Sequence, residues 1–298
     1  MTTRYLPSQL GQEVTEAIAL MAAEGTRGEQ RWSPPQLWRE LAAGGWTQLA
    51  DGDQPGADAE VSLFDLCVMA EAWGRALVGL PLLPTLAARR WLTDRPDADA
   101  AVGLLVPEHG HLLRLYPAQA ALVVGAEGTA AVATADPTDG YAPSLPLSIV
   151  DTSAGPVAPA GALRDYALLA VAEAVGAADR ALQGAVEYAK TRFQFDRPIG
   201  SFQAVKHTLA DMHRDVELAR SGVTWFSNQP EDMAGSAPYV LQLCSSVVER
   251  AIQIYGGIGY TWECDLHWSL RHVAQAHRVV SAALGALDGA PALAGSAA

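Results

Sequence analysis

Long helical segments in the second half of the chain place the strongest constraint on its fold. Apolar residues recur there at three- and four-residue spacing, which is the period of an amphipathic helix. The pattern predicts helices over residues 167–190, 202–226, 237–254 and 266–287. A turn at 196–200, a loop at 228–236 and the pair Gly256-Gly257 separate them. Long helices with short connections predict an antiparallel four-helix bundle.

The first half of the chain has two further patterns. Residues 34–92 are helical in pattern, with an amphipathic run from Leu63 to Val78. Residues 102–157 contain short apolar runs separated by Gly, Asp and Pro, which predict strands of one small antiparallel sheet. The runs are 102–106, 112–116, 121–124 and 130–133. The fold class expected is therefore mainly α with a small β module.

These patterns divide the chain into four parts. We expect an N-terminal helical domain over 1–98, a small β domain over 99–160, the C-terminal four-helix bundle over 161–288 and a disordered tail over 289–298. The bundle's apolar faces are expected to mediate oligomerisation.

Composition narrows the functional classes. The chain of 298 residues carries a net charge of −13, which argues against non-specific binding to nucleic acid or to anionic lipid. Its three cysteines are far apart and in no metal-binding spacing, so we predict reduced thiols and neither a disulfide framework nor a zinc site. The N-terminus lacks the apolar core of a signal peptide, and no apolar run reaches the roughly 20 residues of a membrane helix. We expect a soluble, cytoplasmic protein.

Two segments carry most of the chemical information. In the first, Arg192 and Phe195 stand where a long helix gives way to a turn, and Gln203 opens the next helix. A guanidinium group beside an aromatic ring and an amide is suited to a pyrophosphate and an adenine base. In the second, Gly256-Gly257 after Gln253 allows backbone to approach a ligand closely. The alternative is structural: an Arg192 ion pair, a core Phe195 and a glycine helix cap.

Both segments, 188–212 and 252–263 followed by Arg271, resemble the C-terminal domain of acyl-CoA dehydrogenases in order and separation. Segments 37–46 and 70–84 resemble the front of that family less closely. The resemblance implies an acyl-CoA dehydrogenase fold and an FAD cofactor. It also implies that six positions contact the FAD of a neighbouring subunit. They are Arg192, Phe195, Gln203, Gln253, Gly256 and Gly257.

The chain departs from the family at the catalytic base. That base is a Glu a few residues after the position of Arg271, and the matching position here is about Val280. Some members place it near the start of the first bundle helix, which corresponds to Tyr166. Asp165 could serve if the register slips by one, although an Asp at a helix start is more often a cap or a dipole partner. The stretch that covers the flavin ring is also missing, because residues 93–101 are too few.

Other conspicuous residues have structural explanations. Glu173 lies in an apolar helix and is expected to be paired within the bundle, with an Arg as one partner, rather than catalytic. The spacing of His267, His272 and His277 spreads them around a helix, so a shared metal is not expected. Trp262 and Trp268 are expected to pack at the start of the fourth helix, with an acyl pocket as the alternative.

Three hypotheses follow. The first is a subunit of an FAD-dependent acyl-CoA dehydrogenase that lacks the base and completes the FAD site of a second acyl-CoA dehydrogenase chain, as in α2β2 relatives that act on bulky acyl-CoA thioesters. Such activity would require the partner. The second is a non-redox lyase, cyclase or hydratase on the same scaffold, and the third is a cofactor-free scaffold protein. Retention of Arg192, Gln203 and Gln253 together argues against the third.

Overall fold

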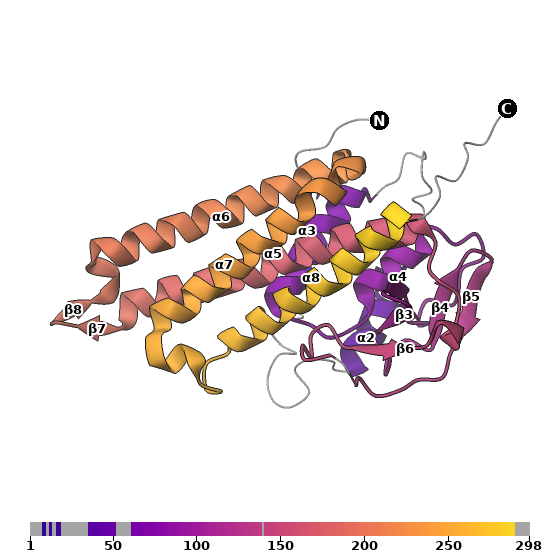
Figure 1. Cartoon of the computed structure of the whole chain (residues 1–298), viewed down its shortest axis with the longest axis horizontal. Coiled ribbons are helices and arrows are strands. Elements are labelled where there is room, and N and C mark those ends of the chain that lie inside the picture. The colour runs from indigo at the N-terminus through magenta and orange to yellow at the C-terminus, as the bar shows by residue number, and fades with distance from the viewer. Residues whose placement is uncertain are drawn as a thin grey trace.

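The structure is a computed structural model that describes residues 8–9, 12–13, 16–18, 35–51, 61–138 and 140–289. The expected tail lies outside the described residues except for Gly289. Residues 52–60 of the expected N-terminal helical domain also lie outside them. Figure 1 shows an elongated molecule, with a bundle of long helices that carries the shorter helices and the sheets at one end.

The four-helix bundle is confirmed. Its helices are α5 (Ala160–Thr191), α6 (Gln203–Asn228), α7 (Met233–Tyr255) and α8 (Leu266–Gly289). Helix α5 packs against the other three (Figure 1), and its small side chains, mostly Ala, allow close approach on several sides. A hairpin of β7 (Phe193–Gln194) and β8 (Arg197–Pro198) connects α5 to α6.

Helix α7 begins earlier than expected. Residues 228–236 are not one loop, because the short η4 (Pro230–Asp232) leads directly into α7 at Met233. Met233 is 1% exposed, and the indole of Trp225 donates a hydrogen bond to Asp232 at 2.7 Å. These contacts stabilise the first turn of α7. Pro238 therefore lies inside the helix rather than in its first turn, at the cost of one backbone hydrogen bond.

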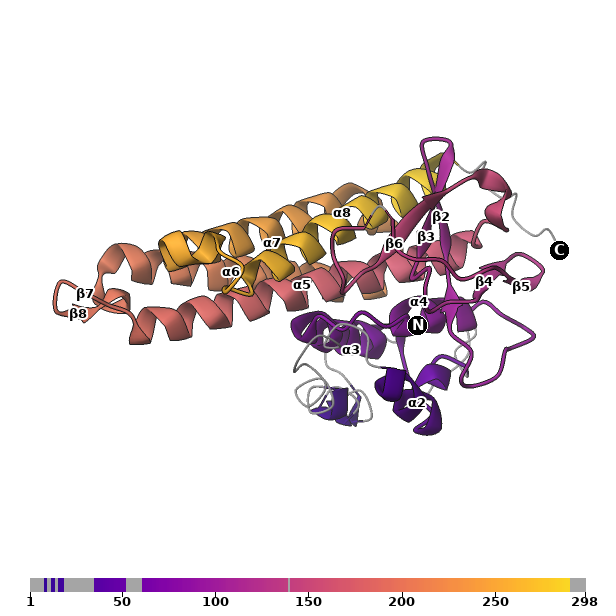
Figure 2. The same ribbon diagram turned by 90° about the horizontal axis from the view of Figure 1, so that it is seen from below.

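The N-terminal helices lie on one side of α5 (Figure 2). They are α2 (Pro35–Ala43), α3 (Leu63–Ala76) and α4 (Leu82–Arg89), with the short η1 (Trp46–Gln48) after α2, and α3 and α4 pack against α5. Ser62 and Asp65 form a capping box at the start of α3. Helix α3 meets α5 through two glycines: a Cβ on Gly74 would lie 1.9 Å from the carbonyl oxygen of Glu173, and one on Gly176 would lie 1.9 Å from that of Glu71. The two backbones are in contact.

The β residues form two small sheets rather than one. Strands β1 (Val102–Gly103), β4 (Leu122–Gly125) and β5 (Gly128–Ala131) form the first, in which β1 and β4 are parallel. Strands β2 (Leu105–Glu108), β3 (His111–Leu115) and β6 (Leu147–Val150) form the second, which is antiparallel. The expected run 102–106 is divided between the sheets, and β6 was not among the expected strands. A single Leu104 separates β1 from β2, so the chain passes from one sheet to the other there.

Ion pairs join the front of the chain to the bundle. Arg90 pairs with Asp165 at 3.0 Å, and the indole of Trp91 donates to the same carboxylate at 2.7 Å. Arg278 on α8 binds both oxygens of Glu108 on β2. Asp165 is 4% exposed and lies inside α5, whose N-cap residue is Pro159. The expectation that Asp165 caps the helix was wrong, because α5 begins several residues earlier than its periodicity indicated.

One hydrophobic cluster runs through α3, α4, the inner strands and all four bundle helices. Within the part of the chain that the structure describes, no helix is both long and apolar enough to cross a bilayer.

We predict that Gly74→Ala destabilises the protein. The added methyl group would meet the Glu173 carbonyl, and overpacking of this kind costs about 1–3 kcal/mol, which exceeds the gain in helix propensity. Thermal unfolding of the variant provides the measurement. Gly285→Ala is the control, since nothing lies within 4 Å of its Cβ position on α8, and it should leave stability unchanged or raised. Equal melting temperatures for Gly74→Ala and the wild type would contradict the packing argument.

Candidate functional site

The first motif lies at the hairpin after α5. Arg192 is the C-cap residue of α5, and its carbonyl oxygen accepts a hydrogen bond from Ile199 N at 2.8 Å. This bond folds the hairpin back on the helix end. The Arg192 side chain is exposed and has no hydrogen bond or ion pair among the described residues. The structural alternative, an Arg192 ion pair, is therefore absent from this part of the chain, and the guanidinium is free to bind a ligand.

The turn of the hairpin presents Phe195 to solvent. Phe195 and Asp196 have φ of 51° and 62°, the positive values of a type I′ turn, and they lie between paired Gln194 and Arg197. A left-handed conformation costs a residue with a Cβ about 1–2 kcal/mol. The Phe195 side chain is 86% exposed, so burial does not offset this strain. Strain of this kind at an exposed aromatic residue is characteristic of a binding site.

Gln203 is the first residue of α6 and is exposed. Its helix has Phe202 at the N-cap with no side-chain cap, so backbone N–H groups of the first turn remain available. The segment is locally basic in an acidic chain. Residues 190–206 carry Lys190, Arg192, Arg197 and Lys206 against Asp196, and Lys190 pairs with Glu187 just before this range. This end of the molecule therefore favours an anion.

The second motif lies at the end of α7. Gln253 is exposed on the last turn. Gly256 has φ 66° and ψ −139°, a conformation that only glycine adopts readily, and its N–H bonds back to the carbonyls of Gln253 and Ile252. Gly256 is thus a helix C-cap, as the structural alternative stated. A Cβ on Gly257 would meet nothing within 4 Å, so its exposed backbone is open to approach.

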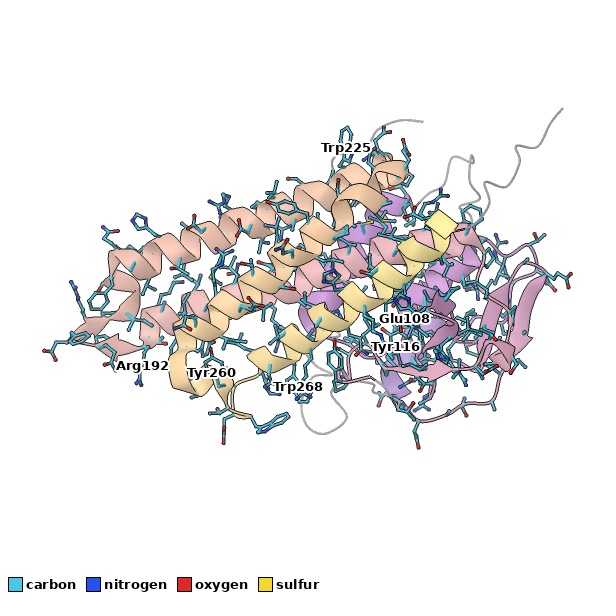
Figure 3. The ribbon with its side chains drawn as sticks, viewed as in Figure 1. Glu108, Tyr116, Arg192, Trp225, Tyr260 and Trp268 are labelled. Carbon is cyan, nitrogen blue, oxygen red and sulfur yellow. The ribbon has the colours of Figure 1, made fainter. Side chains whose placement is uncertain are left out.

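The fold brings the two motifs to one end of the bundle. Tyr188 near the end of α5 stacks on Tyr255 at the end of α7, with ring centroids 4.1 Å apart. The Tyr255 hydroxyl donates to the carbonyl of Gly184 at 3.0 Å. These contacts join the ends of α5 and α7, from which the hairpin and the turn η5 (Gly256–Tyr260) continue. Figure 3 shows Arg192 and Tyr260 at this same end.

Exposed aromatic residues surround both motifs. Phe193 is 59% exposed, Tyr260 75% and Trp262 68%, in addition to Phe195. Exposed apolar residues gathered at one place usually mark a site of interaction. The sequence patterns did not single out Phe193 or Tyr260, because only the tertiary structure shows which aromatic residues face solvent.

The two tryptophans at the start of α8 differ. Trp268 packs against the core as expected, whereas Trp262 is 68% exposed and packs at the surface, against His267 and Trp268 at the start of α8. Trp262 lies in the turn before α8, where the backbone carries it beyond the bundle. The guanidinium of Arg271 lies 5.0 Å from the Trp262 ring centroid and 5.2 Å from that of Trp268. Arg271 also donates to the carbonyl of Tyr141 at 3.4 Å.

The two positions at which the resemblance places a base are buried here. Val280 is 1% exposed and Tyr166 is 0% exposed, and neither is a carboxylate. Asp165 is occupied by Arg90 and Trp91, although its burial raises the pKa above the usual value. Glu173 is fully buried and, among the described residues, pairs with no Arg; His272 Nε2 on α8 lies 3.6 Å from its Oε1 instead. The group that faces Glu173 within the bundle is therefore a histidine and not an Arg.

Comparison with known proteins agrees with this architecture. Residues 157–286 match the family model of the acyl-CoA dehydrogenase C-terminal domain. Acyl-CoA dehydrogenase IpdE2 of Mycobacterium tuberculosis is 32% identical over 294 residues, covering 88% of this chain and 90% of that protein.

Among solved structures, the ChsE4–ChsE5 complex of Mycobacterium tuberculosis has a TM-score of 0.71 at 22% identity, covering 97% of this chain and 100% of the matched chain. A variant of the Tcur3481–Tcur3483 steroid ACAD has a TM-score of 0.66 at 24% identity, covering 94% and 97%. At these identities the structures support the fold. The matched domain and the near full-length relative go further, and the chain belongs to the acyl-CoA dehydrogenase family.

Proposed function

We propose that this chain is the base-lacking subunit of an FAD-dependent acyl-CoA dehydrogenase, and that the end of its bundle completes the FAD site of a partner chain. The observation that carries the proposal is the exposed pair Arg192 and Phe195. Their side chains extend from the body of their own chain. Residues arranged in this way are suited to a ligand held by another subunit.

The residues at this end fit the adenine dinucleotide part of FAD. The guanidinium of Arg192 has no protein partner among the described residues and would bind the pyrophosphate with charge-assisted hydrogen bonds. Phe195 offers an exposed ring face on which the adenine ring could stack, and Gln203 offers an amide for hydrogen bonds. Gln253 with the backbone of Gly256 and Gly257 would line the other side. When bound, FAD would accept the hydride from the acyl β carbon.

The partner would supply the remaining chemistry. Removal of the α proton needs a carboxylate in contact with the thioester, and the two positions at which relatives carry it are Val280 and Tyr166 here. The proposed role of this chain is therefore to bind and orient the cofactor. The proton is transferred to a carboxylate of the partner.

Two features support a hetero-oligomer of α2β2 type. The exposed aromatic residues at the end of the bundle form an apolar surface of the kind that a partner chain buries. The structural neighbours include the ChsE4–ChsE5 complex and the Tcur3481–Tcur3483 steroid ACAD, each named for two chains. The word steroid in the name of the Tcur3481–Tcur3483 protein also supports a bulky, steroid-like acyl-CoA as the substrate.

A non-redox activity has less support. It would need an acid and a base within reach of a substrate. Asp165 and Glu173 are buried at 4% and 0% exposure, and Asp165 is held by Arg90.

The first prediction concerns flavin content. The protein purified alone should show little flavin absorbance and should not dehydrogenate acyl-CoA, because half of the cofactor site is missing. Co-expression with a dehydrogenase chain encoded beside it should give a yellow, active complex. Absorbance spectra near the flavin bands and a dye-reduction assay measure both. A yellow and active homo-oligomer would contradict the partner role, and absence of flavin from both preparations would favour a non-redox or scaffold role.

The second prediction concerns Arg192. Loss of a charged hydrogen bond is worth about 1.5–3 kcal/mol, so Arg192→Ala should weaken FAD binding in the complex by about 10- to 100-fold. The melting temperature of the lone chain should not change, because the side chain is exposed and makes no contact. Lys190→Ala is the matched control, since it removes a nearby charge paired only with Glu187. Equal FAD affinity in both variants would remove Arg192 from the site.

The third prediction separates binding from folding at Phe195. Glycine adopts a positive φ freely, so Phe195→Gly should stabilise the lone chain by up to about 1 kcal/mol. The same change should weaken FAD retention in the complex, because the aromatic ring is lost. Calorimetry and flavin release by gel filtration measure the two effects. A variant that retains FAD as well as the wild type would show that Phe195 is not a ligand of the cofactor.

A further inference from the structure

A polar cluster lies in the interior, away from the candidate site. It joins α5, α8 and the segment before β6, and consists of Ser144, Tyr166, Glu173 and His272. None of these side chains is more than 1% exposed. The hydroxyl of Tyr116 at the end of β3 reaches the carbonyl of Ser144 at 3.4 Å. The cluster therefore lies where α5 and α8 meet the antiparallel sheet.

The cluster contains one good hydrogen bond and several unused polar atoms. His272 Nδ1 and Ser144 Oγ are 2.8 Å apart. His272 Nε2 lies 3.6 Å from Glu173 Oε1, which is too long for a hydrogen bond. Among the described residues, His272 Nε2, both oxygens of Glu173 and the hydroxyl of Tyr166 have no hydrogen-bond partner. Trp73 Nε1, on the helix that touches α5 at Glu173, has none either.

Such a concentration of unpaired atoms has a cost. More than nine in ten buried polar groups in proteins have a partner, because a buried group without one loses its hydrogen bonds to water and gains none in return. Burial raises the pKa of Glu173 well above its usual value and lowers that of His272 to about 4, and both shifts favour the neutral forms. His272 Nε2 and Glu173 Oε1, which are 3.6 Å apart, can share a water molecule that lies to one side, within hydrogen-bond distance of both atoms.

We propose that this cluster is an internal water-binding site, in which at least one water molecule bridges the carboxyl group of Glu173 to the imidazole of His272 and to Tyr166. Depending on the tautomer of His272, its Nε2 is a donor or an acceptor. A neutral carboxylic acid offers one O–H and one carbonyl oxygen. Water donates and accepts, so it satisfies either tautomer, and three or four polar partners are usual for an internal water. The bridge links α5 to α8, and through Ser144 to the segment before β6.

The site also explains why α8 carries the polar residues His272 and Gln275 on its buried face. Gln275, one turn after His272, accepts a hydrogen bond from Tyr141 N at 3.2 Å and donates to the carbonyl of Leu145. Gln275 thus binds both ends of the segment 141–145, and His272 binds Ser144 within it. The bridging water would fix the orientation of the His272 ring and so extend this attachment to α5.

Two variants of Glu173 test the proposal. Glu173→Gln keeps a neutral donor and acceptor and should retain the water. Glu173→Leu removes both and should lose it. Water ¹⁷O and ²H magnetic relaxation dispersion on the full chain counts internal waters of long residence. We expect wild type and Glu173→Gln to match, and Glu173→Leu to lose the signal of at least one molecule. Leu169→Ala is the control, because an apolar cavity on the same helix stays dry and should add no signal.

A crystal structure of the wild type provides an independent measurement that does not depend on a variant folding. Density within hydrogen-bond distance of both His272 Nε2 and the Glu173 carboxyl group supports the proposal. A direct bond between Glu173 and His272 with no density between or beside them overturns it. An unchanged relaxation signal in folded Glu173→Leu overturns it equally.

Discussion

Burial of α5 is the constraint on which the rest of this structure depends. The helix contacts the other three bundle helices and α3, so most of its length has no solvent-exposed face. Small side chains make this possible. Gly74 and Gly176 bring the backbones of α3 and α5 into contact, and larger residues there would separate the helices. In the buried part of α5, Asp165 pairs with Arg90, and burial raises the pKa of Glu173 well above its usual value.

The candidate site exists because α5 extends beyond this packed region. At its C-terminal end the helix leaves the core and turns through a strained hairpin, which exposes Arg192 and Phe195. The end of α7 lies beside it through the stack of Tyr188 on Tyr255. A site built from two helix ends, with free backbone groups and few carboxylates, is suited to bind an anion supplied from outside. The same bundle buries Val280 and Tyr166, the positions at which the resemblance places a base.

The sheets are attached to the bundle by polar contacts as well as by the common core. Arg278 binds Glu108 of β2, while His272 and Gln275 bind the segment that leads into β6. All three residues are on α8. One helix thus holds the antiparallel sheet, and an internal bridge at Glu173 would connect that attachment to α5. Stability of the small β part and correct placement of the bundle helices are coupled in this arrangement.

The sequence by itself determined the four bundle helices, the positions of both motifs and the absence of a carboxylate at Val280 and Tyr166. Helical periodicity is local, and side-chain chemistry is present in the sequence before folding. Only the tertiary structure decided the partners. It divided the strands between two sheets, paired Asp165 with Arg90, placed His272 opposite Glu173 and left Trp262 exposed. Each of these depends on segments far apart in the chain, because burial and pairing follow from which surfaces pack together and not from the pattern within any one segment.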